Sequence, residues 1–244
     1  MDESAQPDLI EMRPDVIALQ VKSFELLKLG PGDRFLDDVD RGNEQALGQL
    51  IRAQIRTIGV DTDPAVVTSA LAFDPNAPLN VAPADRLPLK DGTLDGYRTS
   101  PHFPLISDLR ATLVEARRVL RPGGRIVLVG PDYGFFLMDS DDHDLTDVIG
   151  LGLESRLTFP RAARSYRNVL LDVGFSGAQV DVHTEVITDY QRLSGQLKTA
   201  AEAAVTKSLI TRGEANSWLT EQVERGHRDR FFAVLPTLLV AASR

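Results

Sequence analysis

The chain has 244 residues, of which 43% are hydrophobic, a formal net charge of −8 and no cysteine. This length and apolar content predict one globular domain, residues 1–244. The negative charge argues against nucleic acid and anionic membranes as partners, and the missing cysteines exclude disulfides, thiolate nucleophiles and Cys-ligated metals. The acidic start shows no signal peptide, and no apolar run is long enough to cross a bilayer, so a cytoplasmic protein is expected.

The first half of the chain alternates helical and extended patterns, which predicts βαβ units and a parallel sheet. Residues 1–29 read as a polar leader followed by an amphipathic helix that starts at Pro14. After them we expect a strand over 33–37, a helix over 44–53, a strand over 56–61, a helix from Pro64, and strands over 79–82 and 94–99.

The second half continues the alternation and then adds two extra helical stretches. We expect a helix over 108–120, a strand over 126–130, a helix that follows Ser140 or Asp141, a helix over 160–171, and strands over 178–186 and 230–241. Between them, residues 189–225 form the two helical stretches, which break around 211–213 and are predicted to be an inserted lid.

Two strand ends carry an acid at the spacing of an adenosine-binding half-fold. The first strand runs through Asp37 and Asp38 into a turn, and the second strand ends at Asp61. In doubly wound folds the turn brings backbone to the ligand, and the second acid accepts hydrogen bonds from ribose hydroxyls.

A helix stop precedes the fifth predicted strand and reads RVLRPGGR over 118–125. Together, this helix stop and the acids that end the first two predicted strands resemble the small-molecule branch of the class I S-adenosylmethionine (SAM) dependent methyltransferases. The resemblance runs from about Leu26 to Phe175. The resemblance implies an α/β, doubly wound, Rossmann-like sheet of seven strands, with the last strand antiparallel. It also implies a small-molecule substrate and SAM, or its product S-adenosylhomocysteine, as the cofactor.

The resemblance places the cofactor beside six positions. It also shows that the glycine-rich turn that binds the cofactor in this family is altered here. Those positions are Asp37, Val39, Gly42, Asp61, Thr62 and Ala84. The family follows its first acid with three alternate glycines, but here those positions hold Val39, Arg41 and Asn43 if Asp37 is the acid. If Asp38 is the acid, they hold Asp40, Gly42 and Glu44. Side chains at these positions occupy space that glycine leaves for a ligand, and they resist positive φ, so SAM binding is in question.

Catalytic groups are expected on the connections after the fourth and fifth strands. His102 could move a proton, Tyr133 could donate to a developing oxyanion, and Asp132 lies beside Tyr133. Arg98 could hold a substrate carboxylate or enolate, and Phe135 and Phe136 could form an apolar wall. The acidic run over 139–144 is expected to cap a helix rather than bind metal, and no metal is predicted.

Three functions remain open from the sequence. The favoured one is a small-molecule enzyme on a methyltransferase scaffold that now performs a SAM-independent step, such as cyclisation, isomerisation or elimination, in metabolite or natural-product biosynthesis. This is favoured because the altered positions all fall on the ligand side of the predicted sheet. The alternatives are an active O-, N- or C-methyltransferase of a small molecule and a non-catalytic partner protein; the sequence does not indicate an oligomeric state.

Overall fold

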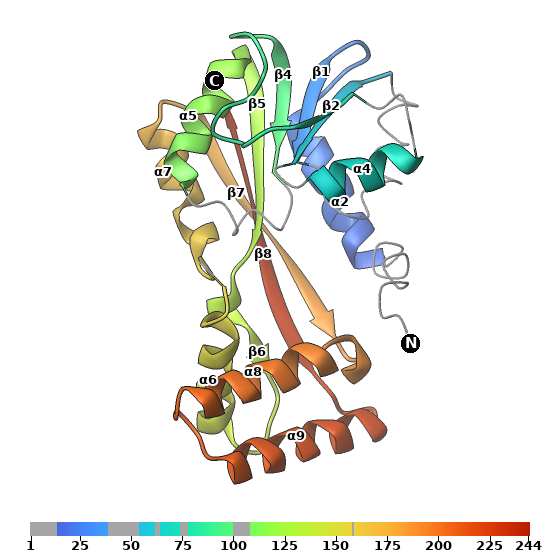
Figure 1. Cartoon of the computed structure of the whole chain (residues 1–244), viewed down its shortest axis with the longest axis vertical. Helices are drawn as coiled ribbons and strands as arrows, with labels where there is room; N and C mark the ends of the chain where they lie inside the picture. Colours follow the sequence, from blue (N-terminus) through green and yellow to red (C-terminus); the bar gives the residue numbers. More distant parts are fainter. Residues whose placement is uncertain (1–13, 39–53, 62–63, 74–77, 100–107, 158) are drawn as a thin grey trace. The chain divides into compact units, whose positions relative to one another are not determined.

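Figure 1 shows the fold in a computed structural model, which describes residues 14–38, 54–61, 64–73, 78–99, 108–157 and 159–244. The chain forms two compact units. The first unit contains residues 1–130, 165–181 and 239–244, and the second contains residues 131–164 and 182–238. The predicted insertion, 189–225, is therefore only part of a larger second unit, and its action as a lid stays a prediction.

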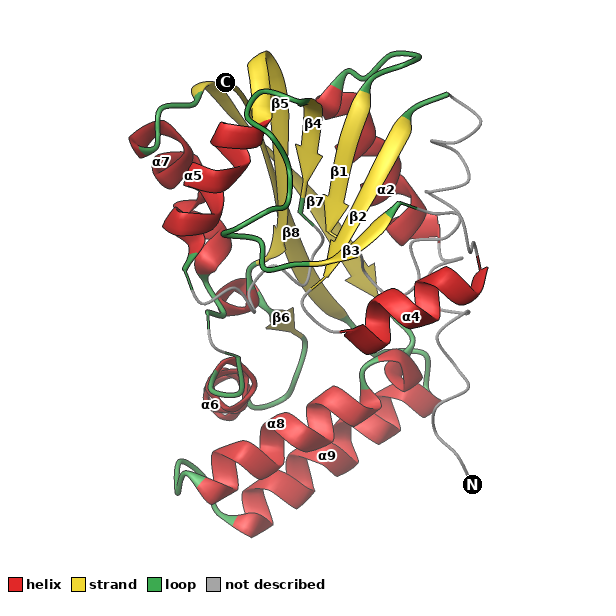
Figure 2. Cartoon of the chain, turned by 45° about the horizontal axis from the view of Figure 1, so that its top comes forward, coloured by secondary structure: helices red, strands yellow, loops and turns green. Residues whose placement is uncertain are grey.

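Among the described residues, the first unit holds most of the sheet and four helices. In chain order its elements are α2 (Pro14–Leu27), β1 (Arg34–Asp38), β2 (Arg56–Asp61), α4 (Pro64–Phe73), β3 (Leu79–Val81), β4 (Leu94–Arg98), α5 (Leu109–Val119), β5 (Leu120–Pro131) and α7 (Tyr166–Asp172). Figure 2 shows α5 and α7 on one side of this sheet and α2 on the other. The helix predicted over 44–53 lies outside the described residues.

The sheet has the strand order β3-β2-β1-β4-β5-β8-β6, and β7 pairs with β8. Strands β1 to β5 run parallel, with Asp37 opposite both Gly59 and Arg98. The last strand is antiparallel to β5: Gly123 pairs with Arg244 near the start of β5, whereas Asp132 pairs with Pro236 just after its end. The doubly wound, Rossmann-like prediction is confirmed, although the sheet has an eighth, two-residue strand, β6 (Leu137–Met138), that the sequence did not indicate.

A buried cluster fixes α2 to the sheet of the first unit. Leu27, Phe35, Val127 and Val129 are fully buried there, and the ring of Phe24 meets that of Phe35 edge-on at 5.9 Å. The helix stop at the start of β5 works as predicted, because α5 ends at Val119 and Gly123 takes φ +79°. The strand nevertheless begins at Leu120, six residues earlier than expected, and the β4–β5 register shifts between Leu94 and Gly96.

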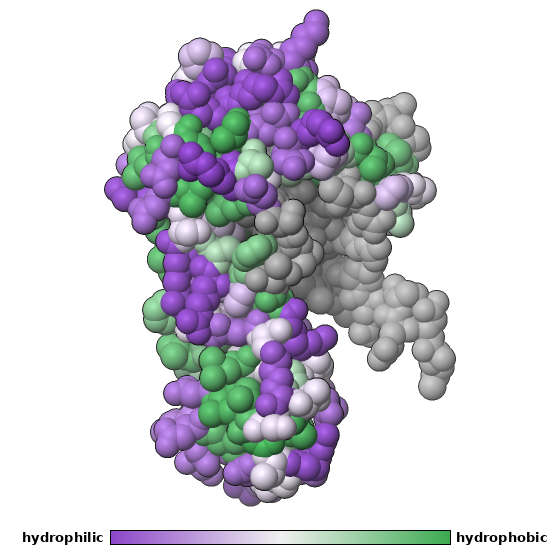
Figure 3. Space-filling view, turned by 60° about the vertical axis from the view of Figure 1, so that its left-hand side comes forward, coloured by the Kyte–Doolittle hydropathy of each residue, from purple (hydrophilic) through white to green (hydrophobic). Residues whose placement is uncertain are grey.

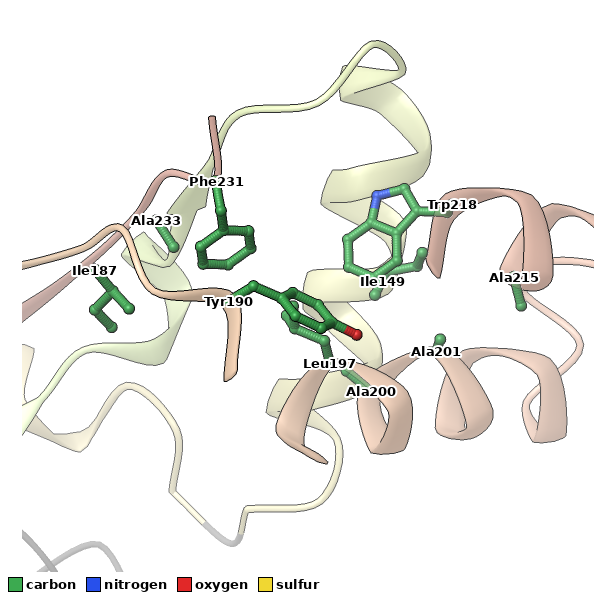
Figure 4. Close-up of a cluster of buried hydrophobic side chains, with 10 residues drawn as sticks. All are labelled: Ile149, Ile187, Tyr190, Leu197, Ala200, Ala201, Ala215, Trp218, Phe231 and Ala233. Atoms are coloured by element: carbon green, nitrogen blue, oxygen red, sulfur yellow. The ribbon is translucent and has the colours of Figure 1, made fainter. Parts of the chain in front are cut away.

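The second unit is mainly helical. Its elements are the 3-10 turn η2 (Tyr133–Phe135), β6, α6 (His143–Glu154), η3 (Ala162–Ser165, which ends in the first unit), η4 (Tyr190–Arg192), α8 (Ser194–Thr206) and α9 (Arg212–His227). Two long strands, β7 (Ser176–Ile187) and β8 (Ala233–Ser243), belong partly to each unit. Figure 4 shows the core where α6, α8 and α9 meet, with Ile149, Leu197 and Trp218 among its side chains.

Two details of this unit differ from the sequence expectation. The cap of α6 is Asp142, which accepts a hydrogen bond from Leu145 N at 2.9 Å, not Ser140 or Asp141. Asp139 and Asp141 instead pair with Arg225 at 2.6 and 2.7 Å. The helical break spans 207–211, and Thr211 caps α9 through a capping box with Glu214, so Arg212 and Gly213 lie inside the first turn.

Candidate functional site

The carboxyl ends of the parallel strands lie at one edge of the first unit. The strands β1, β2, β3 and β4 end at Asp38, Asp61, Val81 and Arg98. This is the edge at which open α/β sheets bind ligands. Four predicted site residues, Val39, Gly42, Thr62 and His102, lie outside the described residues.

Asp37 and Arg98 form a buried ion pair just inside this edge. Arg98 Nε and Nη2 donate to the two carboxylate oxygens of Asp37 at 2.9 and 2.6 Å, and the two side chains, of Arg98 and Asp37, are 5% and 9% exposed. The remaining nitrogen, Nη1, donates to Ser23 Oγ at 2.9 Å, and the guanidinium lies 4.3 Å above the ring of Phe24. The arrangement links β1, β4 and α2.

This pair changes the interpretation of both residues. The resemblance implied that Asp37 faces the cofactor, and the sequence suggested that Arg98 holds a substrate anion. All three nitrogens of the Arg98 guanidinium contact Asp37 or Ser23 in the structure. A bidentate, buried pair of this kind is geometrically specific and is expensive to break. We therefore interpret the pair as part of the framework of the site.

The other described cofactor positions lie nearby in the chain. Asp61 is the last residue of β2 and pairs with Val81 in the parallel ladder. Ala84 follows β3 and is half-buried, next to the buried Ala82. The backbone of Asp61 is thus where the adenosine-binding half-fold requires an acid, and the ligand contact itself stays a prediction.

In the second unit, Asp132 organises the turn that carries the predicted aromatic wall. Asp132 is 1% exposed, accepts two hydrogen bonds from Arg164 Nε and Nη2 at 2.5 and 3.0 Å, and accepts a third from Gly134 N at 3.0 Å. The guanidinium of Arg164 also lies 4.5 Å from the ring centre of Phe135. These contacts make Asp132 the cap of η2, and they hold Phe135 outside, 54% exposed.

Tyr133 and Phe136 line a pocket of about 250 Å³ inside the second unit. Its walls come from the η2–β6 segment, α6, α8 and α9, and they include Met138, Ile149 and Trp218. Tyr133 is half-buried, and removal of its hydroxyl from water raises its pKa above the ordinary value. The hydroxyl therefore stays protonated at neutral pH and is a hydrogen-bond donor.

Sequence reasoning missed most of this pocket. The chain's single tryptophan, Trp218, lies about 80 residues after Tyr133, and its Nε1 donates to Thr146 Oγ1 at 2.9 Å. Trp218 and Leu197 look from the sequence like ordinary apolar residues on two extra helices. Only their helical spacing signalled an apolar face, and spacing alone does not separate a pocket wall from a solid core.

Comparison with known proteins finds a matching family model and several relatives. Residues 38–128 match the family model described as "Methyltransferase domain". A 37.1 kDa protein of a Streptomyces fradiae transposon is 30% identical over 98% of this chain and 72% of its own length. The demethylmenaquinone methyltransferase of Mycolicibacterium vanbaalenii is 32% identical, but over only 43% of this chain and 44% of that protein.

Solved structures share the fold. The structure of geranyl diphosphate C-methyltransferase from Streptomyces coelicolor, in complex with Mg²⁺, geranyl diphosphate and S-adenosylhomocysteine, superposes with a TM-score of 0.53 at 18% identity. The match covers 93% of this chain and 77% of that one. With the parallel strand order, the acid that ends β2 and the family-model match, these similarities show that the chain belongs to the class I SAM-dependent methyltransferase family.

Proposed function

We propose that the chain is a small-molecule enzyme on a methyltransferase scaffold that no longer transfers a methyl group from SAM. Its step would be a SAM-independent one, such as a cyclisation, isomerisation or elimination. The observation that carries this proposal is the loss of family glycines after β1, whose Asp37 is paired with Arg98. With Asp37 as the family's acid, the three glycine positions hold Val39, Arg41 and Asn43. Those side chains would fill the space that the cofactor's amino acid end needs.

The rest of the scaffold supports the proposal that the chain is an active enzyme and not a protein that has lost its activity. The sheet, the RVLRPGGR stop and the buried pair of Asp37 and Arg98 are all intact. The pocket beside Tyr133 and Phe136 offers apolar walls and one protonated phenol. In the proposal Tyr133 donates to the developing oxyanion, and Asp132 positions the turn that carries it. His102 is proposed separately as the group that moves a proton.

The main alternative is a methyltransferase that retains SAM. The family-model match and the demethylmenaquinone methyltransferase similarity favour it. In that case the turn after β1 would follow a different path and still hold the cofactor. A non-catalytic partner protein remains the second alternative.

A glycine reconstruction separates the first two functions. Val39, Arg41 and Asn43 are changed together to glycine, and the affinity for S-adenosylhomocysteine is measured by isothermal titration calorimetry. If the side chains exclude the cofactor, the triple variant should bind at least about tenfold more tightly than the native chain, although glycine lowers its stability through unfolded-state entropy. Equal affinities, with the thermal transition intact, would contradict the proposed exclusion.

A further inference from the structure

Eight of the fifteen residues that line the pocket in the second unit have apolar side chains. Its apolar lining consists of Phe136, Met138, Ile149, Leu151, Leu153, Leu197, Ala200 and Trp218. Trp218 is 1% exposed and gives its side-chain N–H to Thr146, so its ring lies behind the wall of the pocket. In Figure 3, apolar surface also gathers on the lower part of the face shown, which is formed by the second unit. The apolar side chains favour an apolar part of a ligand, while the polar ones can fix its orientation.

Five polar or charged side chains also line the pocket, and they belong to Tyr133, Thr146, Asp147, Glu154 and Arg161. The guanidinium of Arg161 is engaged by Glu154 through two hydrogen bonds of 2.7 and 2.9 Å, so its charge is balanced. Asp147 is exposed, and among the lining residues that the structure describes it is the one charged side chain outside an ion pair. The rim is therefore slightly negative and disfavours an anionic ligand.

Tyr133 supplies the hydrogen-bonding group. Its hydroxyl makes no hydrogen bond within the described part of the chain, and the side chain is half-buried. A donor in this state gains from a ligand oxygen, because burial without a partner costs free energy. An apolar cavity of roughly 150 Å³ holds a benzene ring, so this pocket of about 250 Å³ has room for a second ring.

We propose that this pocket binds a neutral two-ring aromatic molecule, or an apolar group of similar size, that carries one carbonyl or ether oxygen, with Tyr133 as the hydrogen-bond donor. This inference rests on the proposed small-molecule activity and names its substrate class. It does not depend on whether SAM binds. Titration with SAM and titration of the pocket therefore test the two proposals separately, and either one can fail without the other.

The test uses three probes of matched size on the full chain: 2-acetylnaphthalene, 2-ethylnaphthalene and 2-naphthoate. Calorimetry should give the tightest binding for the ketone and the weakest for the carboxylate. One neutral hydrogen bond predicts a ketone preference over the hydrocarbon of about 2- to 12-fold. Emission from Trp218, the chain's only tryptophan, should fall as the ketone binds, which locates the site.

Two variants address the pocket directly. A Cβ at Gly150, a lining residue on α6, would meet nothing within 4 Å, so Gly150→Leu can enter the cavity without a backbone clash and should weaken ketone binding at least about tenfold. Gly195 on α8 is equally open but lies outside the pocket lining, and Gly195→Leu should leave the affinity unchanged. Tyr133→Phe keeps the ring and should remove the preference for the ketone.

The binding results test both the site and the class of its ligand. No binding of any probe, or equal affinity of the native chain and Gly150→Leu, would overturn the site. Tightest binding of 2-naphthoate would overturn the neutral ligand class. If Gly150→Leu does not fold, the Tyr133→Phe comparison still tests the donor, since it changes a single oxygen atom.

Discussion

At the scale of single residues, the buried pair of Asp37 and Arg98 is the most consequential contact of the sheet edge. Both side chains are buried away from water, and the hydrogen bonds between them replace those that water would make. Removal of one partner leaves the other as an uncompensated buried charge, which costs about 3–5 kcal/mol. The pair therefore couples the stability of the fold to residues that family resemblance would assign to ligands.

We expect Asp37→Asn to lower the free energy of unfolding by about 3 kcal/mol or more, because Arg98 would remain buried without its counter-ion. Urea denaturation followed by circular dichroism measures this. Asp85→Asn, at an exposed position, is the matched control and should change stability by less than about 0.5 kcal/mol. Equal stability of the two variants would mean that the pair contributes little to the framework.

At the scale of elements, helices α6 and α8 approach each other closely through a glycine. A Cβ at Gly152 would lie 2.3 Å from the carbonyl oxygen of Ala200, whereas a Cβ at Gly150, two residues earlier, would meet nothing. Gly152 is thus required by the packing of the second unit, and Gly150 is not.

The two glycines give opposite predictions for the same substitution. Gly152→Ala should destabilise the protein by about 1–3 kcal/mol, because α8 must move away from α6. Gly150→Ala should stabilise it by about 0.5–1 kcal/mol through the better helix propensity of alanine. Thermal unfolding of both variants is the measurement. A stabilising Gly152→Ala would show that the helices do not pack as described.

A second element-scale contact fixes the loop after β3 to helix α5. Glu115 accepts hydrogen bonds from Leu87 N at 2.7 Å and from Arg118 at 2.7 and 2.6 Å, while Arg118 also binds Asp91. The bonds from Arg118, and then the one from Leu87, hold the pKa of Glu115 below its ordinary value against the opposing effect of burial.

This lowered pKa sets a direction for pH dependence. The folded state binds the Glu115 proton less tightly than the unfolded state, so the stabilisation is present above the unfolded pKa of about 4.3 and disappears as pH falls through the folded value. We expect Glu115→Gln to cost about 1–2 kcal/mol at neutral pH and to cost progressively less below about pH 4. Glu224→Gln, in an exposed pair with Arg228, should cost less than about 0.5 kcal/mol; a cost for Glu115→Gln that does not depend on pH would contradict this account.

How far the sequence predicts the structure depends on the range of the interactions. The strands, the helix stop before β5 and the acid that ends β2 follow from local patterns, and the structure has them within a few residues, apart from the early start of β5. The partnership of Asp37 with Arg98 joins residues 61 positions apart, and the wall formed by Trp218 joins helices from different parts of the chain. Such contacts arise from tertiary packing, which periodicity does not encode.

At the scale of the whole molecule, the methyltransferase fold is intact, whereas the sequence is altered at the edge of the sheet where ligands bind. The strand order and the family-model match are those of a methyltransferase, and no helix in the described ranges is long and apolar enough to span a membrane. The departures from the family's glycine pattern fall after the first strand, at Val39, Arg41 and Asn43 if Asp37 is the family's acid, or at Asp40 and Glu44 if Asp38 is. The scaffold is thus retained, while the turn that would hold the cofactor is changed.

Calorimetric titration of the native chain with SAM and with S-adenosylhomocysteine measures whether the changed turn still binds the cofactor. Because side chains replace glycines of the turn, we expect no binding, or a dissociation constant above about 1 mM, for both ligands. Circular dichroism of the same sample confirms that the chain is folded. A dissociation constant in the micromolar range for either ligand would contradict the account and would make the chain a SAM-binding methyltransferase.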